Sequence, residues 1–201
     1  MDSSNAKPLR LRDRLRDETV RAILDAAEDV LSEQGLGARM EQIAARAGVA
    51  VGTLYNHFED RQALISALAC SRRDAFFTRL DAALAVSKAK PVSDQLRAFL
   101  GAVAEHAKAH GRYLSMLVQS GEGPAHASPV KSLIADLVAR ADAIVARGVA
   151  SGELRADAGE VMGLALVGSI RAANVRVLEG GATWGPLIEP LVDLFLRGAR
   201  R

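Results

Sequence analysis

Apolar residues recur every three or four positions along most of this 201-residue chain. From Asp17 onward, Val20, Ile23, Leu24, Ala27, Val30 and Leu31 follow this helical spacing. Gly35 and Gly37 come directly after them, where glycines commonly end helices. No stretch of useful length alternates between apolar and polar residues, so the pattern predicts an all-α fold.

Glycine, proline and capping residues divide the rest of the chain into further helices. Gly48 separates two short helices over residues 40–47 and 51–57, and Asp60 is placed to cap a long fourth helix. Later helices are expected at about 94–106, shortly after Gly111, and at 130–149, 158–178 and 186–200. Asp157 is the expected cap of the helix over 158–178, and the Gly- and Pro-containing segment 120–129 is expected to be a loop.

The composition agrees with a folded helical protein and excludes several other classes. Hydrophobic residues make up 49% of the chain and aromatic residues 4%. The longest apolar run, VMGLALVGSI, is far shorter than the roughly 18 residues that span a membrane. No apolar core follows the charged N-terminus, so we expect no secretion signal, no membrane partner and a cytoplasmic location. Cys70 is the single cysteine, which excludes an intramolecular disulfide.

Charge is distributed unevenly, although the formal net charge is only +2. Residues 1–61 hold nine Lys or Arg against eleven Asp or Glu, so their overall charge does not indicate nucleic-acid binding. One local run differs, because RLRDRLR contains Arg10, Arg12, Arg14 and Arg16 against a single aspartate. Such a run is either a solvated arm or a segment that contacts phosphates.

The stretch AGVAVGTLYNHFED, residues 47–60, is polar and has no basic side chain other than a histidine. Two short helices on either side of Gly48 form a helix-turn-helix arrangement, and Ala44 is small enough for them to cross closely. Ile43, Val49 and Leu54 are the expected apolar contacts with the first helix. Thr53, Tyr55, Asn56 and His57 then lie on the exposed side of the second short helix, which such motifs place in the DNA major groove.

The segment RMEQIAARAGVAVGTLYNHFEDRQAL, from Arg39 to Leu64, resembles the DNA-binding signature of the TetR/AcrR family of bacterial transcription regulators. The resemblance covers roughly residues 20–65. It implies a helix-turn-helix DNA-binding domain with a basic N-terminal arm over residues 1–65. A long helix would join it to a helical ligand-binding and dimerisation domain over residues 66–201.

The resemblance also assigns roles to single residues. Thr53, Tyr55 and His57 would contact phosphates or base edges, and Val51 lies where the family reads bases. An apolar contact with a thymine methyl group is what a valine can offer there. Asn56 could bond to a base or a phosphate, and Arg61 occupies the place of a phosphate-clamping lysine. A packing role is the alternative for Tyr55.

The sequence departs from the family pattern at two helix starts. Ala38, Arg39 and Met40 stand where a Ser or Thr usually caps the second helix, and Ala50 stands where Ser is frequent. Each missing cap costs about 1 kcal/mol on typical figures. Arg39 could recover a phosphate contact through its charge, so we include it among the candidate DNA-binding residues.

The remaining helices contain isolated polar residues on apolar faces, as small-molecule sites do. The candidate effector-binding residues are His106, Tyr113, Gln119, Arg171 and Asn174; surface or core positions are the alternative for each. The last two helices are rich in leucine and contain the small residues Gly163, Ala165, Gly168 and Ala172. The resemblance implies that these helices form the interface of a homodimer, while part of their apolar faces must serve the internal core.

The sequence gives little support to an enzymatic or metal-binding function. His106 and His110 are four apart and could face one metal ion, but no third ligand is evident. Gly163 to Ser169 has the glycine spacing of a phosphate-binding loop without its lysine. We therefore predict no enzyme, no metal and no cofactor. The prediction is a homodimeric regulator, most often a repressor in this family, that a small molecule releases from a palindromic operator in double-stranded DNA. A helical interaction protein without DNA binding, or a metal-dependent enzyme, is the alternative.

Overall fold

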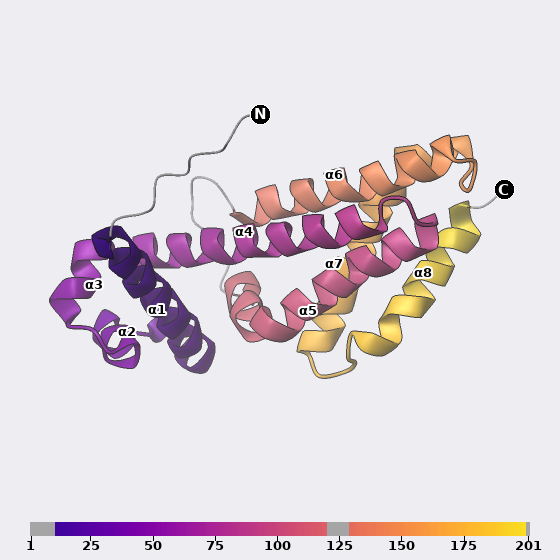
Figure 1. Ribbon diagram of the computed structural model, residues 1–201. Helices are drawn as coiled ribbons and strands as arrows, with labels where there is room; N and C mark the ends of the chain where they lie inside the picture. The colour runs from indigo at the N-terminus through magenta and orange to yellow at the C-terminus, as the bar shows by residue number, and fades with distance from the viewer. Residues whose placement is uncertain (1–10, 120–128, 200–201) are drawn as a thin grey trace, which may run out of the picture. The chain divides into compact units, whose positions relative to one another are not determined.

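The computed structural model describes residues 11–119 and 129–199, and within these ranges it contains helices and no strand (Figure 1). The predicted all-α class is therefore confirmed. The chain divides into two compact units, unit 1 (Met1–Leu68) and unit 2 (Ala69–Arg201), which are described separately. Across the described ranges, no helix has both the length and the apolar character that crossing a membrane requires.

Unit 1 consists of three helices and the first turns of a fourth. They are α1 (Leu11–Gln34), α2 (Met40–Ala47), α3 (Val51–His57) and α4 (Arg61–Ser87), and the last continues into unit 2. α1 packs against α2, and α2 packs against α3. The side chains that have no exposed surface are Ile23, Ala27, Leu31, Ile43, Ala44, Leu54, Leu64 and Leu68. Each large aliphatic side chain among them contributes roughly 1.5–3 kcal/mol through burial, which offsets the weak stability of short helices.

The first helix is longer than its apolar pattern predicts. α1 begins at Leu11, so the expected start at Asp17 is wrong, and Arg12, Arg14 and Arg16 lie on the first turns of this helix. Their contact with DNA stays a prediction, and Arg10 lies outside the described residues. Leucine and arginine are good helix formers, and no glycine or proline follows Pro8 before the apolar pattern begins.

Unit 2 is built from the second part of α4 and four further helices. These are α5 (Val92–Gln119), α6 (Pro129–Ala150), α7 (Met162–Leu178) and α8 (Gly185–Ala199), with the short 3-10 helix η2 (Ala156–Glu160) before α7. α6 packs against α7, and α5 contacts α6, α7 and α8. The core draws its large side chains from all five helices and from the turn before α8, and it includes Phe76, Phe99, Ile144, Leu166, Trp184 and Phe195.

α5 continues without a break past Gly111, where the sequence predicted an interruption. A Cβ atom on Gly111 would lie 3.2 Å from Cδ2 of Leu178 at the end of α7. This glycine therefore allows a close approach between two helices and does not end one.

The start of α7 also differs from the prediction. The helix begins at Met162, and the residue before it, Val161, makes no side-chain capping bond. Asp157 lies in η2, where its Oδ1 forms a salt bridge with Nε of Arg155 at 3.0 Å, so Asp157 does not cap the helix. The predicted loop over 120–129 lies outside the described residues except for Pro129, the first residue of α6.

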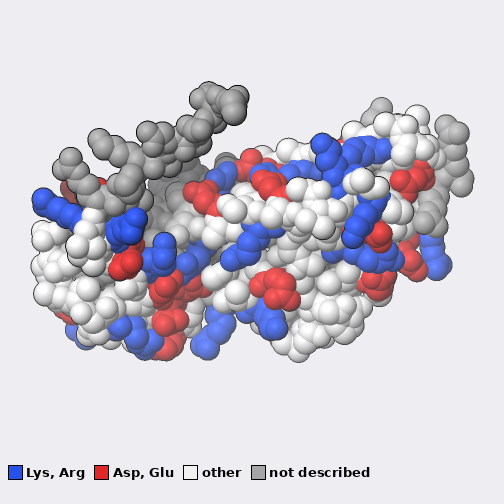
Figure 2. Space-filling view, in the orientation of Figure 1, with Lys and Arg blue, Asp and Glu red and all other residues white. Residues whose placement is uncertain are grey.

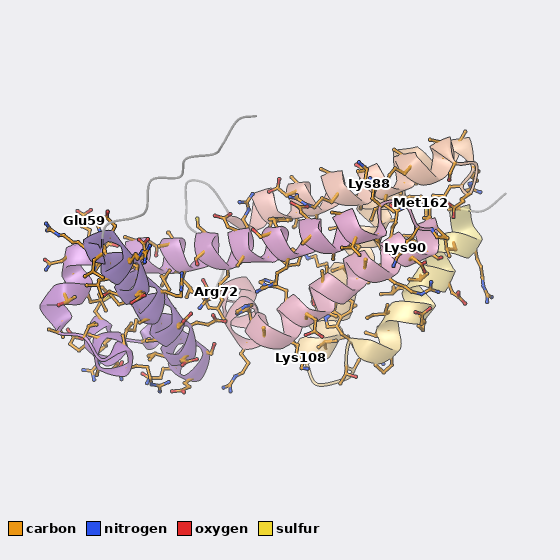
Figure 3. The ribbon with its side chains drawn as sticks, viewed as in Figure 1. Glu59, Arg72, Lys88, Lys90, Lys108 and Met162 are labelled. Atoms are coloured by element: carbon orange, nitrogen blue, oxygen red, sulfur yellow. The ribbon has the colours of Figure 1, made fainter. Side chains whose placement is uncertain are left out.

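A buried polar network holds the turn between α4 and α5, where Figure 3 labels Lys88 and Lys90. The Nε2 atom of Gln95, which is 3% exposed, donates to the Lys90 carbonyl at 2.9 Å and to the Lys88 carbonyl at 3.4 Å. Its Oε1 accepts from Nε of Arg147 on α6 at 2.8 Å. Because each polar atom of this buried amide has a partner, the network fixes the turn without leaving an orphaned group.

A second set of polar contacts joins α4 to α6, which run alongside each other within unit 2 (Figure 1). The guanidinium of Arg140 lies 4.1 Å from the ring centre of Phe77 and donates to both carboxylate oxygens of Asp81, at 2.6 and 2.8 Å. Arg73 also contacts the Phe77 ring and pairs with Asp136. The hydrogen bond from Arg140 lowers the pKa of Asp81 below its ordinary value.

Candidate nucleic-acid interface

The turn between α2 and α3 has the geometry that its glycine predicts. Gly48 adopts a left-handed conformation with φ of +70°, which is strained for residues with a side chain. The N–H of Val49 donates to the Ala44 carbonyl at 3.0 Å and closes the end of α2. Ala44 has no exposed surface, so its small size permits the close crossing. This turn sets the direction in which α3 leaves α2.

The start of α2 is capped by a residue that the sequence analysis overlooked. The backbone N–H of Arg39 donates to Oε1 of Gln42 at 2.9 Å, and the side chain of Arg39 itself makes no capping bond. This is one half of a capping box, in which the third helical residue reaches back to the cap. The spacing of Gln42 from Arg39 is the sequence signal that could have identified it. The start of α3 has no side-chain cap at Ala50, as the sequence predicts.

α3 buries one side in unit 1 and presents the other to solvent. Leu54 is fully buried and Phe58, just after the helix, is 7% exposed. On the opposite side, the exposed residues are Val51, Gly52, Tyr55 and Asn56. Thr53 and His57 are half-buried at the edges of this surface. Tyr55 is 46% exposed, which argues against a purely packing role for it.

The exposed side of α3, which we call the reading face, contains Val51, Gly52, Tyr55 and Asn56 and has no charged side chain. The space-filling view shows this region, at the left edge, as mainly white (Figure 2). Elsewhere on the visible surface, blue and red side chains are interspersed. Such a face can form hydrogen bonds and apolar contacts with base edges but cannot neutralise phosphates.

Cationic side chains lie outside the reading face. Arg12, Arg14 and Arg16 are exposed on the first turns of α1, and Arg39 is exposed before α2. Arg61 is half-buried at the start of α4, with its Nε atom turned inward. The N–H of Ala63 donates to Oδ1 of Asp60 at 2.7 Å, which confirms the predicted cap of this helix.

Arg46 has a structural role within unit 1. Its two terminal nitrogens donate to Glu33 on α1 at 3.2 and 2.8 Å, and Asp29 lies 3.7 Å away. The pairing with Glu33 raises the pKa of Arg46. These contacts fix α2 against α1. They also pair the exposed arginine of α2 with carboxylates of the protein itself.

Comparisons with known proteins agree with this arrangement. Residues 23–68 match the family model described as bacterial regulatory proteins, tetR family. This match covers the second part of α1, the helices α2 and α3, and the first turns of α4. A curated relative, the HTH-type transcriptional regulator SAR0097 of Staphylococcus aureus (strain MRSA252), is 33% identical over 82 residues. The match spans 41% of this chain and 40% of that protein.

Solved structures of bacterial regulators share the fold of nearly the whole chain. The fatty acid degradation regulator FadR from Bacillus halodurans is 19% identical, with a TM-score of 0.73 over 90% of this chain and 99% of its own. A TetR-like transcriptional regulator from Rhodococcus sp. RHA1 is 24% identical, with a TM-score of 0.71 over 90% of this chain and 94% of its own. At these identities the similarity shows the fold alone.

Of the candidate effector-binding residues, His106 lies in the most distinctive environment. It is 8% exposed, its ring centre lies 4.5 Å from that of Phe76 and 4.9 Å from that of His110, and its buried Nδ1 has no hydrogen-bond partner among the described residues. Burial, with smaller contributions from His110, Arg79 and Arg72, lowers the pKa of His106 to about 4. The imidazole is therefore neutral near pH 7.

The other candidates are dispersed. Tyr113 is 1% exposed on α5, whereas Arg171 is exposed on α7. Asn174 accepts a hydrogen bond from Trp184, and the side chain of Gln119 lies outside the described residues.

A small apolar cavity in unit 2 has room for about one water molecule. Its lining residues are Val92, Leu96, Val145, Leu154, Met162, Leu166, Phe195, Leu196 and Ala199, none of which is a candidate effector-binding residue. Figure 3 labels Met162 at the start of α7. The described residues also contain no cluster of three or more His, Cys, Asp or Glu that could hold a metal ion.

Proposed function

We propose that this protein is a transcriptional regulator that binds double-stranded DNA through α3. The observation that carries this proposal is the uncharged, exposed reading face on the second helix of a tight helix-turn-helix. A glycine in the left-handed conformation redirects the chain into that helix. The exposed arginines at the start of α1 and before α2 supply the charge that phosphate contacts need. The match of residues 23–68 to the TetR family supports the same function.

We further propose that the protein acts as a homodimer on a palindromic operator. α7 and α8 leave Leu164 and Leu194 about two-thirds exposed, and Val175 and Leu178 are also exposed. Ala165, Gly168 and Ala172 are exposed small residues that permit close helix packing. Gly163 serves the internal core instead, because a Cβ atom there would lie 1.8 Å from Oδ1 of Asp142 on α6. A second copy is the occupant that would cover the exposed apolar side chains.

The proposed dimer has a direct test. Light scattering at micromolar concentration is expected to give about twice the chain mass of 21.3 kDa. Leu164→Glu combined with Leu194→Glu is expected to give the single-chain mass, whereas Val86→Glu, on an exposed site of α4, leaves the dimer intact. A monomeric wild-type protein would remove the basis for binding a palindrome.

We also propose that a small-molecule effector binds unit 2. Its binding would release the protein from DNA, as expected for a repressor. His106 and Tyr113 are its proposed contacts on α5, because both are buried polar side chains, and Gln119, Arg171 and Asn174 remain weaker candidates. An effector can release the operator only if it binds the DNA-free state more tightly than the DNA-bound state.

A gel-shift assay with the DNA upstream of the protein's own gene tests DNA binding. Tyr55→Ala and His57→Ala are expected to weaken binding while leaving the helical content unchanged. Val86→Ala is the matched control, since Val86 is an exposed apolar residue of unit 2. If the wild-type protein shifts no DNA, the alternative of a helical interaction protein is favoured. Turnover of a substrate would instead favour an enzyme.

A further inference from the structure

Gly52, the second residue of α3, is explained neither by its backbone nor by its packing. The described glycines with a positive φ are Gly35, Gly48, Gly152 and Gly180, so Gly52 does not need a special conformation. A Cβ atom built on Gly52 would meet no atom within 4 Å. Glycine is also a poor helix former. The fold would therefore accept a larger residue, and the space above Gly52 is open to a partner.

The neighbouring side chains give this open space a defined chemistry. Val51 and Tyr55 are one helical turn apart and both are exposed, which makes one side of the space apolar. Asn56 lies one turn after Gly52 and contributes a primary amide on the other side. We call this arrangement of Val51, Gly52, Tyr55 and Asn56 the α3 notch. It consists of the same four residues as the reading face and contains no Lys or Arg.

The four base pairs present different groups in the major groove. Guanine offers two acceptors that Arg or Lys contacts best, whereas thymine offers a methyl group and adenine offers a donor–acceptor pair that suits Asn. The α3 notch lacks the cation for guanine and has both the apolar wall and the amide for a T·A pair. A side chain at position 52 would occupy the space that a methyl group needs.

We propose that the α3 notch reads one T·A pair in each half-site. The thymine methyl group packs over Gly52 against Val51 and Tyr55, and the Asn56 amide bonds to N6 and N7 of the adenine. This inference rests on the DNA-binding function proposed above and specifies which base chemistry the protein selects.

The first experiment uses a library of random DNA duplexes, from which the full-length protein selects a consensus. Each thymine of the consensus is then replaced by uracil, which removes only the methyl group. Loss of one buried methyl is expected to weaken binding about fourfold per half-site, and about fifteenfold when both half-sites are changed. One thymine position per half-site should show this effect.

The second experiment tests which residues carry the preference. Gly52→Ala is expected to fold with an unchanged or higher Tm, to bind the consensus more weakly, and to lose the distinction between thymine and uracil. Gly101→Ala is the matched control, because Gly101 also lies in a helix with no atom within 4 Å of a built Cβ. Asn56→Ala should lose sensitivity to 7-deazaadenine at the paired position, which lacks the N7 acceptor.

The outcomes separate this inference from the proposed function. If no sequence is enriched and no duplex is bound, both the proposed DNA-binding function and the inferred reading of T·A pairs are overturned. If the protein selects DNA but tolerates uracil at every thymine, only the T·A inference is overturned. A consensus that depends on guanine at the α3 contacts, or a Gly52→Ala protein that still distinguishes thymine from uracil, would also overturn it.

Discussion

Nε1 of Trp184 donates a hydrogen bond to Oδ1 of Asn174 at 3.0 Å and joins the turn before α8 to α7. Trp184 is 6% exposed and belongs to the core of unit 2, so its N–H needs a protein partner. This contact gives Asn174 a structural role, whether or not it also contacts an effector.

Asn174→Ala is therefore expected to destabilise the protein by about 1–3 kcal/mol, because it leaves a buried donor without a partner. Urea unfolding followed by circular dichroism measures the change. The double variant with Trp184→Phe should lose less than the sum of the two single changes, since the donor is removed as well. Additive losses would mean that the hydrogen bond contributes nothing measurable.

His106 predicts a dependence of stability on pH. Its folded-state pKa of about 4 lies below the ordinary value of 6.5, so the unfolded chain takes up a proton first as the pH falls. Stability is therefore lost as the pH falls from 6.5 toward 4, by about 2 kcal/mol between pH 7 and pH 5. His106→Leu should remove this part of the pH dependence. The comparison is the difference in unfolding free energy between the two proteins at each pH; a constant difference contradicts the prediction.

Gly148 allows α6 to approach the residues around it closely. A Cβ atom there would lie 2.7 Å from Cδ1 of Leu154 and 2.7 Å from Cγ2 of Val92. Gly148→Ala is expected to destabilise unit 2 by about 1–3 kcal/mol through overpacking, although alanine is the better helix former. Gly101→Ala provides the control and should be neutral or stabilising. Thermal unfolding measures the Tm of both variants. An equal rise in Tm for both would refute the packing argument.

Arg61 is the predicted phosphate contact at the start of α4. Each neutralised phosphate contributes about −0.9 to the slope of log affinity against log salt concentration. Because a dimer makes each contact twice, Arg61→Ala should flatten the slope by about 2 and weaken specific and non-specific DNA alike. Arg197→Ala, which removes an exposed arginine from α8, is the control. Thr53→Ala should instead lose more affinity on the operator than on random DNA. An unchanged slope for Arg61→Ala would show that Arg61 contacts no phosphate.

The helix-turn-helix could be predicted closely because its determinants are local. The bounds of α2 and α3 agree with the sequence pattern, and Gly48 alone determines how the chain turns between them. The buried positions of Ile43 and Leu54 follow from the same spacing. A short helix that ends at a glycine, as α2 does, leaves few alternative arrangements for the helix after it.

One error arose where a tertiary contact decides the role of a residue. Gly111 was expected to end a helix, but its function depends on Leu178, which is far away in the sequence. Asn174 stays a candidate effector contact, and its partner Trp184 likewise cannot be recognised from spacing. The proposed effector site would depend on such distant contacts throughout, which is why its residues stay predictions.

The bond from the Arg39 N–H to Gln42 Oε1 affects how relatives of this protein would be found in genomes. A search pattern that demands a hydroxyl side chain immediately before α2 would reject this chain, although α2 begins at the expected residue. A pattern that accepts either a hydroxyl at that position or a glutamine three residues later would retain it. The glutamine accepts from the N–H of residue 39, whereas a hydroxyl at position 39 would accept from the N–H of residue 42, so a relative can have either bond or both.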